Sequence, residues 1–397
     1  MSTHSIPADR YAARIARAQA ALPAEDASAL LIGPGSDLQY LTGYGAHESE
    51  RLTMLVVPAA GRPTLVLPRL ELALGQGCTA GSAGLIEVAP WEETEDPILS
   101  VAAKLDDSDS RPEIQLGALG GTWGRLGGLL VSDRLWATFL LRLQAALPDA
   151  AFGLASTVLT TLRLTKDAQE IELLRKASHM ADRVVEQIAA GRLIGRTEAE
   201  VSKEVFDRLV AEGHDSAEFA IVASGPNGAS PHHQPGDKVI AAGEPIVLDI
   251  GGRLEGYWSD TTRTLWVTGD TNIRPTDEFT KLFDTLHSAQ EAQRAAVRPG
   301  LVAAELDAVG RKMIAKAGYG ESFIHRTGHG TGLDGHEDPY IVSSNETPLV
   351  AGNVFSVEPG IYIEGKFGAR IEDLVACGVN GADELNVSSR ELYVVRG

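Results

Sequence analysis

Residues 245–260 of the chain read PIVLDIGGRLEGYWSD, and this stretch decides how the C-terminal part folds. An apolar run, typical of a buried strand, ends at Asp249, and a glycine pair then opens a turn. The chain returns through an aromatic pair to Asp260. We therefore expect a β-hairpin that brings the two carboxylates together. A lone aspartate after an apolar run is more often a turn residue, so this pair by itself favours a structural interpretation.

A second pair of acids near the C-terminus favours a functional interpretation over a structural one. Glu358 comes directly after the apolar run 354–357, and Glu372 follows beyond a glycine-containing turn, which predicts another hairpin. Side chains alternate along a strand, so Arg370 and Glu372 share one face and Ile371 points into the core. Carboxylates deep in apolar strands must be paired, protonated or bound to metal. The sequence places too few cations near these acids for pairing, which favours metal.

A fifth candidate ligand is His329, in the string GHGTGL, whose small neighbours leave room for a side chain in a crowded centre. One imidazole and four carboxylates suit two hard or borderline divalent ions. Manganese is preferred, and zinc and cobalt are also compatible. Two such ions ~3.5–4 Å apart can activate water and polarise a carbonyl, so the leading chemistry is hydrolysis.

Other histidines lie near glycine-rich segments of the same half. Any one of them alone would be interpreted as an ordinary core residue. Their clustering around the proposed metal site favours hydrogen-bond donors that hold substrate or stabilise charge, in the case of His232, His325 and His336. His233 is interpreted as structural. Residues 360–367 have the spacing of a phosphate loop, but Phe367 stands where a hydroxyl is required, so a hairpin turn is predicted.

The composition bounds the class of protein. The chain has 397 residues, 44% of them hydrophobic, which is enough for two globular domains without disulfide or metal staples. Its two cysteines are far apart in sequence, as expected in a reducing cytoplasm. A net charge of −19 would repel nucleic acid and anionic membranes, and no apolar run is long enough to span a bilayer. We therefore expect a soluble cytoplasmic protein with no nucleic-acid or membrane partner.

Helical and strand patterns indicate two domains, at residues 1–158 and 159–397. The first is predicted to be an α/β layer, with a helix over residues 8–21 and strands near 29–33, 53–57 and 64–67. The glycine-rich stretch 117–128 matches no nucleotide-binding fingerprint and is interpreted as an ordinary turn region. The second domain is predicted to be α+β, with helices over residues 167–190, 198–212, 277–294 and 303–317.

These motifs resemble those of the pita-bread metallopeptidases, which include aminopeptidase P, prolidase, methionine aminopeptidase and the metal-free creatinase. The specific marks are VLDIG around Asp249, SDTTRT around Asp260, GHGTGL around His329, EPG from Glu358 and RIE ending at Glu372. The stretch DLQYLTGY at residues 37–44 is similar to the creatinase-type N-terminal domain, which methionine aminopeptidases lack. The resemblance implies a pita-bread C-terminal domain behind a creatinase-like N-terminal domain, with all five ligands retained.

The resemblance also implies a role for each residue. Asp249 would hold one ion, His329 and Glu358 the other, and the remaining ligands, Asp260 and Glu372, would bridge both. Catalytic roles fall on His232, His325, His336 and Glu358. Substrate-binding roles fall on His232, His336 and Arg370.

The implied reaction is hydrolysis of the peptide bond before proline. Glu358 would orient the attacking water, and His336 with His232 would stabilise the oxyanion and the bound substrate. We expect a preference for Xaa-Pro dipeptides because Arg370 is available to bind a free carboxylate. Cleavage of longer peptides, as by aminopeptidase P, is the alternative. A homodimer is expected, in which the loop from Tyr44 to Arg51 reaches the neighbouring cleft.

Two further readings compete with this one. A non-catalytic peptide-binding relative would tolerate the loss of a ligand, whereas all five are present here. A general aminopeptidase or an esterase stays open, because a fold does not fix the substrate.

Overall fold

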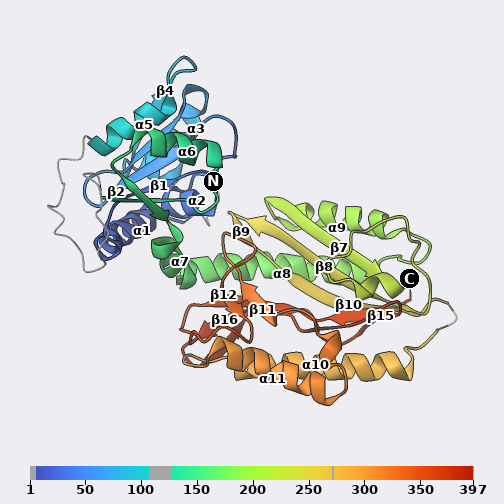
Figure 1. Ribbon diagram of the computed structural model, residues 1–397. Helices are drawn as coiled ribbons and strands as arrows, with labels where there is room; N and C mark the ends of the chain where they lie inside the picture. Colours follow the sequence, from blue (N-terminus) through green and yellow to red (C-terminus); the bar gives the residue numbers. More distant parts are fainter. Residues whose placement is uncertain (1–5, 107–126, 271, 397) are drawn as a thin grey trace. The chain divides into compact units, whose positions relative to one another are not determined.

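The computed structural model describes residues 6–106, 127–270 and 272–396, and its contacts divide the chain after Arg163 into two compact units (Figure 1). The predicted boundary, between residues 158 and 159, falls within helix α7 and stays a prediction. The turn region predicted at 117–128 lies, up to residue 126, outside the described residues. Each unit is therefore described by itself.

The first unit is built on a six-stranded sheet in the order β4-β3-β2-β1-β5-β6. Its strands are β1 (Ala27–Ile32), β2 (Met54–Pro58), β3 (Thr64–Pro68), β4 (Glu87–Trp91), β5 (Gly128–Val131) and β6 (Ala151–Leu154). Its helices are α1 (Ala8–Ala21), α2 (Ser36–Thr42), α3 (Leu72–Gly77), α4 (Thr79–Ser82), α5 (Pro97–Asp106), α6 (Ala137–Ala146) and α7 (Ser156–Leu164).

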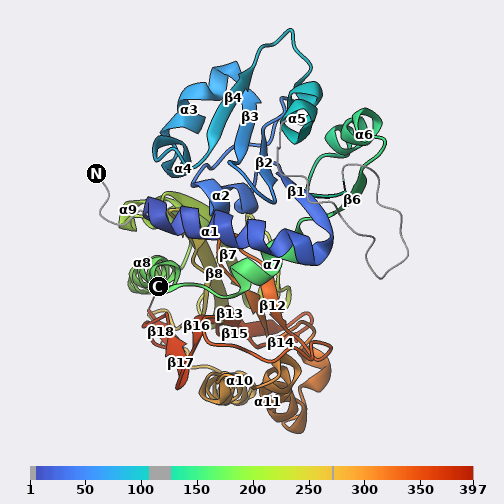
Figure 2. The ribbon, with the colours of Figure 1, turned by 90° about the vertical axis from the view of Figure 1, so that its left-hand side faces the viewer.

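Strand β1 explains why this sheet has helices on both faces. Ala29 and Leu31 belong to the core that α5 and α6 close, whereas Leu30 and Ile32, equally buried, point to the opposite face. Helices α1 and α2 lie on that side (Figure 2). A strand buried on both faces reads as a continuous apolar run, as this one does. The predicted α/β layer is confirmed.

The second unit places sheets between two pairs of helices (Figure 1). The helices are α8 (Ala168–Ala190), α9 (Glu198–Glu212), α10 (Asp277–Ala296) and α11 (Ala303–Lys316). The first sheet has the order β18-β10-β8-β7, with β9 paired to β8, and comprises β7 (Ser216–Ser224), β8 (Glu244–Leu254), β9 (Tyr257–Trp258), β10 (Thr261–Val267) and β18 (Tyr393–Val395). The second has the order β12-β11-β13-β16-β17 and comprises β11 (Gly328–Gly330), β12 (Glu337–Ile341), β13 (Val354–Val357), β16 (Asp373–Gly378) and β17 (Gly381–Glu384). A separate hairpin pairs β14 (Gly360–Ile363) with β15 (Phe367–Arg370).

Local sequence signals set the ends of the first two helices of this unit. Asp167 and Glu170 form a capping box at the start of α8, and Thr197 and Glu200 form another at the start of α9. Each box satisfies two backbone N–H groups that the first turn of a helix leaves free. The four predicted helices and the α+β class are confirmed. The segment with phosphate-loop spacing is the β14–β15 hairpin, as predicted, with Gly365 at φ 73° in its turn.

The loop from Tyr44 to Arg51 is held within the first unit. Tyr44 donates a hydrogen bond to Glu71 over 2.9 Å, and Arg51 pairs with Glu50 at 2.6 Å and with Glu93 at 2.7 Å. The predicted reach of this loop into a neighbouring subunit stays a prediction.

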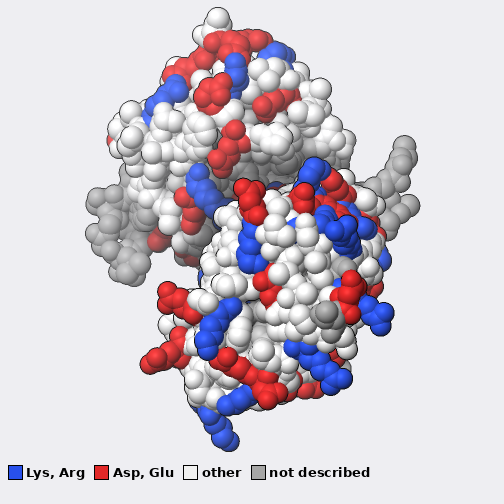
Figure 3. All heavy atoms as spheres, turned by 90° about the vertical axis from the view of Figure 1, so that its right-hand side faces the viewer, with Lys and Arg blue, Asp and Glu red and all other residues white. Residues whose placement is uncertain are grey.

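Two observations bear on larger partners. None of the helices among the described residues is long and apolar enough to cross a membrane. Figure 3 shows one face of the molecule, on which basic and acidic side chains are interspersed. The expected absence of a nucleic-acid or membrane partner stays a prediction.

Candidate metal centre

The alternation of side chains along β8 directs Asp249 away from the helices. Ile246, Leu248 and Ile250 pack into the core under α8 and α9, so Asp249 points to the opposite face of the sheet. Its neighbour across the antiparallel pair is Thr262 of β10. This arrangement confirms the first predicted hairpin and places its polar side chains on one face.

The structure brings all five predicted ligands together on this face. Ligand atoms within 4.8 Å of one another form three overlapping groups: Asp249, Asp260 and Glu372; His329, Glu358 and Glu372; and Asp260, His329 and His336. The second pair of acids flanks the β14–β15 hairpin and does not lie within its strands, because Glu358 follows β13 and Glu372 precedes β16. Strands β13 and β16 pair side by side, which brings both acids to the cluster.

The sequence-based claim that these acids lack nearby cations is wrong for Asp249. Arg370, which is 3% exposed, places Nη2 2.6 Å from Asp249 Oδ2. The other oxygen, Oδ1, is buried and has no hydrogen-bond partner among the described residues. A buried oxygen without a partner is costly unless a ligand satisfies it. Because Asp249 belongs to the cluster of possible metal ligands, this unpartnered oxygen fits a cation.

The backbone fixes the orientation of His329. Its Nδ1 lies 3.1 Å from the carbonyl oxygen of Gly330, which only accepts, so Nδ1 carries the proton and donates. Nε2 then faces the acids, 3.2 Å from Glu358 Oε1 and 3.6 Å from Asp260 Oδ2. Burial alone would raise the pKa of Glu358, but in the metal-free protein the protonated form of His329, whose Nε2–H donates to Glu358, outweighs it and brings the pKa down to about 2. Glu358 is therefore ionised at neutral pH.

The flanking glycines allow this close packing. A Cβ atom on Gly328 would lie 1.8 Å from the carbonyl oxygen of Ser356, and one on Gly330 would lie 2.2 Å from that of Asp338. The small neighbours of His329 are thus required by the approach of adjacent strands.

Two acids of the cluster hold protons more tightly than usual. Burial, followed by the charge of Asp249, raises the pKa of Asp260 well above its ordinary value. Burial, followed by the charges of Asp260 and Glu358, does the same for Glu372. The cluster thus carries more negative charge than its own cations neutralise. An oxygen-rich donor set with one imidazole fits hard or borderline divalent ions.

Tyr362, which the sequence analysis missed, links Arg370 to His325. Arg370 Nη1 donates to the Tyr362 hydroxyl over 2.9 Å, and this hydroxyl lies 2.9 Å from His325 Nε2. Nδ1 of His325 lies 2.7 Å from the carbonyl oxygen of Arg326 and must donate to it, so Nε2 accepts the Tyr362 proton. Burial raises the pKa of Tyr362 to about 12 although the charge and hydrogen bond of Arg370 lower it, and this keeps the proton in place.

His336 lies at the rim of the cluster, with its ring centroid 3.8 Å from that of His329. Arg326 Nη2 lies 3.1 Å from His336 Nδ1. Because a guanidinium only donates, Nδ1 accepts and the proton of the neutral ring sits on Nε2. Burial, followed by the charges of His329 and Arg326, lowers the pKa of His336 to about 4. The ring is thus neutral at pH 7, with an N–H available.

His232 is exposed and belongs to none of the three groups. Its loop is fastened by Glu198, a fully buried side chain at the start of α9. Glu198 accepts hydrogen bonds from the backbone and hydroxyl of Ser224, both at 2.7 Å, from Asn227 at 3.1 Å and from His233 at 2.7 Å. The structural interpretation of His233 agrees with this contact.

The sequence matches two family descriptions over most of its length. The model of the Creatinase/Prolidase N-terminal domain matches residues 14–165, and that of metallopeptidase family M24 matches residues 172–378. The chain belongs to metallopeptidase family M24. The predicted resemblance, the pita-bread fold and the metallopeptidase class are confirmed, and the clustered acids are compatible with the divalent ions that this family implies.

Relatives of this M24 peptidase carry dipeptidase names. It is 42% identical over 396 residues to the "Probable dipeptidase PepE" of Mycobacterium tuberculosis, covering 100% of this chain and 99% of that protein. It is 34% identical over 364 residues to the "Xaa-Pro dipeptidase" of Lactobacillus delbrueckii subsp. lactis, covering 90% of this chain and 92% of that protein. The crystal structure of dipeptidase PepE from Mycobacterium ulcerans matches with a TM-score of 0.86 and 45% identity, over 98% of this chain and 99% of that one.

Proposed function

We propose that this M24 peptidase is an Xaa-Pro dipeptidase that uses two divalent ions, with manganese the preferred metal. The observation that carries the proposal is the buried cluster of four carboxylates and one imidazole, together with the unpartnered oxygen of Asp249. The names of its relatives supply the substrate class. The homodimer and the cytoplasmic location expected from the sequence stay predictions.

The ligand roles follow the three overlapping groups. Asp249 would hold one ion, and His329 with Glu358 the other. Asp260, Glu372 and His329 each belong to two of the groups, and of these only the two carboxylates have a second ligand atom, which suits them to bridge both ions. Ions bound there would supply a water of lowered pKa and polarise the scissile carbonyl.

The chain's own residues would orient the reactants. Glu358 stays ionised, so it can accept a hydrogen bond from the attacking water and orient it. His336, held by Arg326, presents a neutral ring whose Nε2–H can donate to the carbonyl oxygen as negative charge develops there. His232 would bind the substrate from its loop. His325 would act through Tyr362, because both of its ring nitrogens already have partners in the protein.

The free carboxylate of a dipeptide needs a cation, and we assign it to Arg326 in place of Arg370. Each guanidinium nitrogen of Arg370 already donates to a protein oxygen, namely those of Thr262, Tyr362 and Asp249. Arg326 is half-buried, stacks on the ring of Tyr340 at 4.4 Å and touches His336 at the rim. A guanidinium beside the reacting carbonyl is suited to a carboxylate one residue away.

Metal reconstitution tests the proposal. Metal-stripped protein is supplied with Mn²⁺, Co²⁺ or Zn²⁺ and incubated with Ala-Pro, with Asp260→Ala as the control. The proposal expects metal-dependent hydrolysis by the wild type and its loss in the variant. Stoichiometric metal binding without hydrolysis of Ala-Pro would keep the site and reject the substrate.

A further inference from the structure

Glu372 has an unusual position for a residue in a rigid cluster. It lies in a two-residue link between β15 and β16, strands that belong to different sheets, so no strand ladder of its own fixes its backbone. Its N–H donates instead to the carbonyl oxygen of Thr262 over 3.0 Å, as an isolated bridge. The Thr262 hydroxyl also donates to Glu372 Oε2 over 2.7 Å. Strand β10 therefore holds one side of this link.

Arg263, the next residue of β10, holds the other side. Its guanidinium is fully buried, and Nη1 donates to the carbonyl oxygen of Glu372 over 2.6 Å and to that of Thr262 over 2.9 Å. Nη1 thus donates to the backbone carbonyl groups of both residues that form the isolated β-bridge. The backbone of Glu372 is fixed at both its N–H and its C=O.

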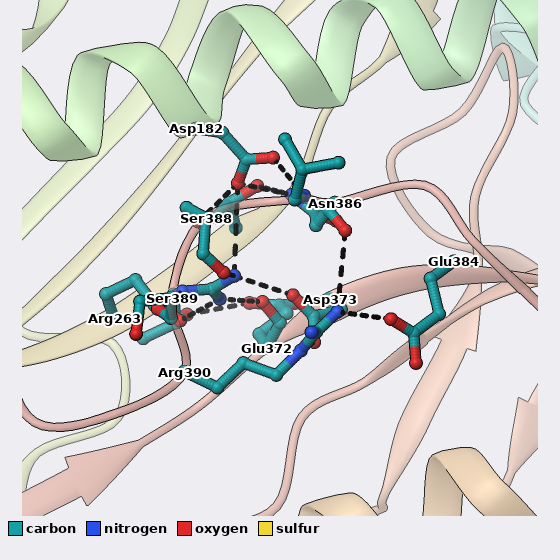
Figure 4. A network of polar contacts seen from close by, with 12 residues as sticks. Asp182, Arg263, Glu372, Asp373, Glu384, Asn386, Ser388, Ser389 and Arg390 are labelled. Atoms are coloured by element: carbon teal, nitrogen blue, oxygen red, sulfur yellow. Dashed lines mark hydrogen bonds and ion pairs between the residues drawn. The ribbon is translucent and has the colours of Figure 1, made fainter.

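Arg263 is itself oriented from behind by the C-terminal segment 386–390. Nε donates to the carbonyl oxygen of Ser389 over 2.8 Å, and Nη2 donates to that of Ser388 over 3.1 Å (Figure 4). Nη2 also pairs with Asp373 Oδ1 at 2.7 Å. All three guanidinium nitrogens are therefore engaged, so the direction of Nη1 toward Glu372 is determined by its surroundings.

The segment 386–390 is also held by two acids, Asp182 and Asp373, that lie next to Arg263. Asp182 of α8 accepts hydrogen bonds from Asn386 over 3.0 Å and from the Ser388 hydroxyl over 2.5 Å (Figure 4). Arg390 pairs with the second oxygen of Asp373 at 2.5 Å. The match to the M24 family model ends at residue 378, so this segment lies beyond the matched residues.

We propose that Arg263 and the segment 386–390 position Glu372 as a metal ligand and thereby set the affinity of the site for divalent ions. The inference rests on the proposed function, because it takes Glu372 to be a ligand. Repulsion among the clustered carboxylates favours movement of this two-residue link away from the site, and the hydrogen bond from Arg263 to Glu372 opposes this movement. Arg263 pairs with Asp373 and lies 3.9 Å from Asp182, so acids outside the site offset its charge and we take its effect on the site to be one of geometry.

Titration of metal-stripped protein with MnCl₂, followed by calorimetry, tests this role. Arg263→Lys keeps a cation for Asp373, but one ammonium group cannot bridge the carbonyl groups of Glu372 and of the segment. We expect it to lower the affinity of at least one ion by roughly ten- to hundred-fold, as outer-sphere variants of metal sites do. Arg294→Lys, the matched control, makes the same exchange at the other oxygen of Asp373, from α10, outside the segment and without a bond to Glu372. Its affinity should change less than about threefold.

If Arg263 only stabilised the fold, the variants would change the melting temperature and not the affinity for Mn²⁺. A lower melting temperature of the metal-free protein in both variants, with equal Mn²⁺ affinity in both, would overturn the inference. If Arg263→Lys does not fold, Ser388→Ala decides: it removes one tether of the segment and no charge. A severalfold loss of Mn²⁺ affinity supports the inference, and an unchanged affinity overturns it. Wild-type protein that binds no Mn²⁺ would overturn the proposed function and this inference together.

Discussion

Arg370 donates a hydrogen bond to only one of the two carboxylate oxygens of Asp249. Arg370 Nη2 lies 2.6 Å from Oδ2, while the buried Oδ1 has no hydrogen-bond partner among the described residues. Burial raises the pKa of Asp249, and the charge of Arg370 counteracts that rise. The arginine thus favours the anionic form of the acid and leaves its second oxygen without a hydrogen bond among the described residues.

Removal of this cation should make metal binding more dependent on pH. In Arg370→Gln the pKa of Asp249 rises further, so at neutral pH a proton competes with the metal for the carboxylate. We expect Mn²⁺ affinity to fall by about tenfold or more at pH 6 and to recover in part at pH 8, measured by calorimetry at both values. Arg370→Lys, which keeps a charge, should show the smaller effect. The same loss at both pH values would contradict this explanation.

Glu372→Gln should make the metal-free protein more stable and the metal-loaded protein less so. The pKa of Glu372 lies above its ordinary value in the folded state, so its ionisation costs stability as pH rises through the unfolded-state value. At pH 7 the neutral side chain removes this cost. The melting temperature without metal should rise by roughly 2–4 °C, which is what about 1 kcal/mol gives in a domain of this size.

The same variant should lose most of the increase in melting temperature that Mn²⁺ gives the wild type. Glu364→Gln, an exposed acid in the β14–β15 turn, is the control and should change neither value. A lower metal-free melting temperature with full stabilisation by Mn²⁺ would show that Glu372 is a structural acid.

Glu198 should control how well the loop of His232 binds substrate. Burial raises the pKa of Glu198, but its hydrogen bonds from Ser224 and His233 outweigh this and lower it. Glu198 accepts hydrogen bonds from four donor atoms, and Glu198→Gln puts an amide that also donates in its place. This leaves a buried donor unsatisfied at a cost of roughly 1–3 kcal/mol.

We expect KM for Ala-Pro to rise by about tenfold in Glu198→Gln, with a smaller change in kcat. The stabilisation by Glu198 is present above the ordinary carboxyl pKa and is lost as pH falls through the lowered folded-state value. Glu200→Gln, in the same helical turn, preserves the capping box and serves as the control. Equal KM values in the two variants would argue against the role of Glu198 in holding the loop.

Arg326 should distinguish a substrate with a free carboxylate from one without it. A hydrogen bond to a charged group contributes about 1.5–3 kcal/mol, so Arg326→Gln should lower kcat/KM for Ala-Pro by roughly ten- to hundred-fold. Alanyl-prolinamide has no carboxylate, so the variant should lose turnover of it only through the weaker hold on His336, and this loss should be smaller than the loss for Ala-Pro by at least about threefold. Comparison of the two substrates by steady-state kinetics checks this. Equal losses for both would remove Arg326 from carboxylate recognition.

The predictable features were those that short stretches of sequence encode. The helices of the second unit were predictable because apolar periodicity and capping residues such as Asp167 and Thr197 are local. Within each predicted pair of acids, the two residues come together because the strands next to them are paired, β8 with β10 and β13 with β16.

The features that could not be predicted depend on strand order and on contacts across long separations. Arg370 lies 121 residues from Asp249, and neither residue indicates the other in the sequence. Tyr362 reads as one aromatic residue in an apolar strand, and only the pairing of β14 with β15 places it between Arg370 and His325. Tyr362 lies two residues after Gly360 in the strand, so the sequence indicates that both lie on the same face. It does not indicate which residues Tyr362 contacts.

The most direct test of the central claim is the ratio of kcat/KM for Ala-Pro to that for Ala-Pro-Ala, measured with Mn²⁺-reconstituted protein. An Xaa-Pro dipeptidase should cleave the dipeptide with a ratio above about ten and should lose activity on removal of metal. A preference for the tripeptide would contradict the claim and indicate an Xaa-Pro aminopeptidase on the same metal site.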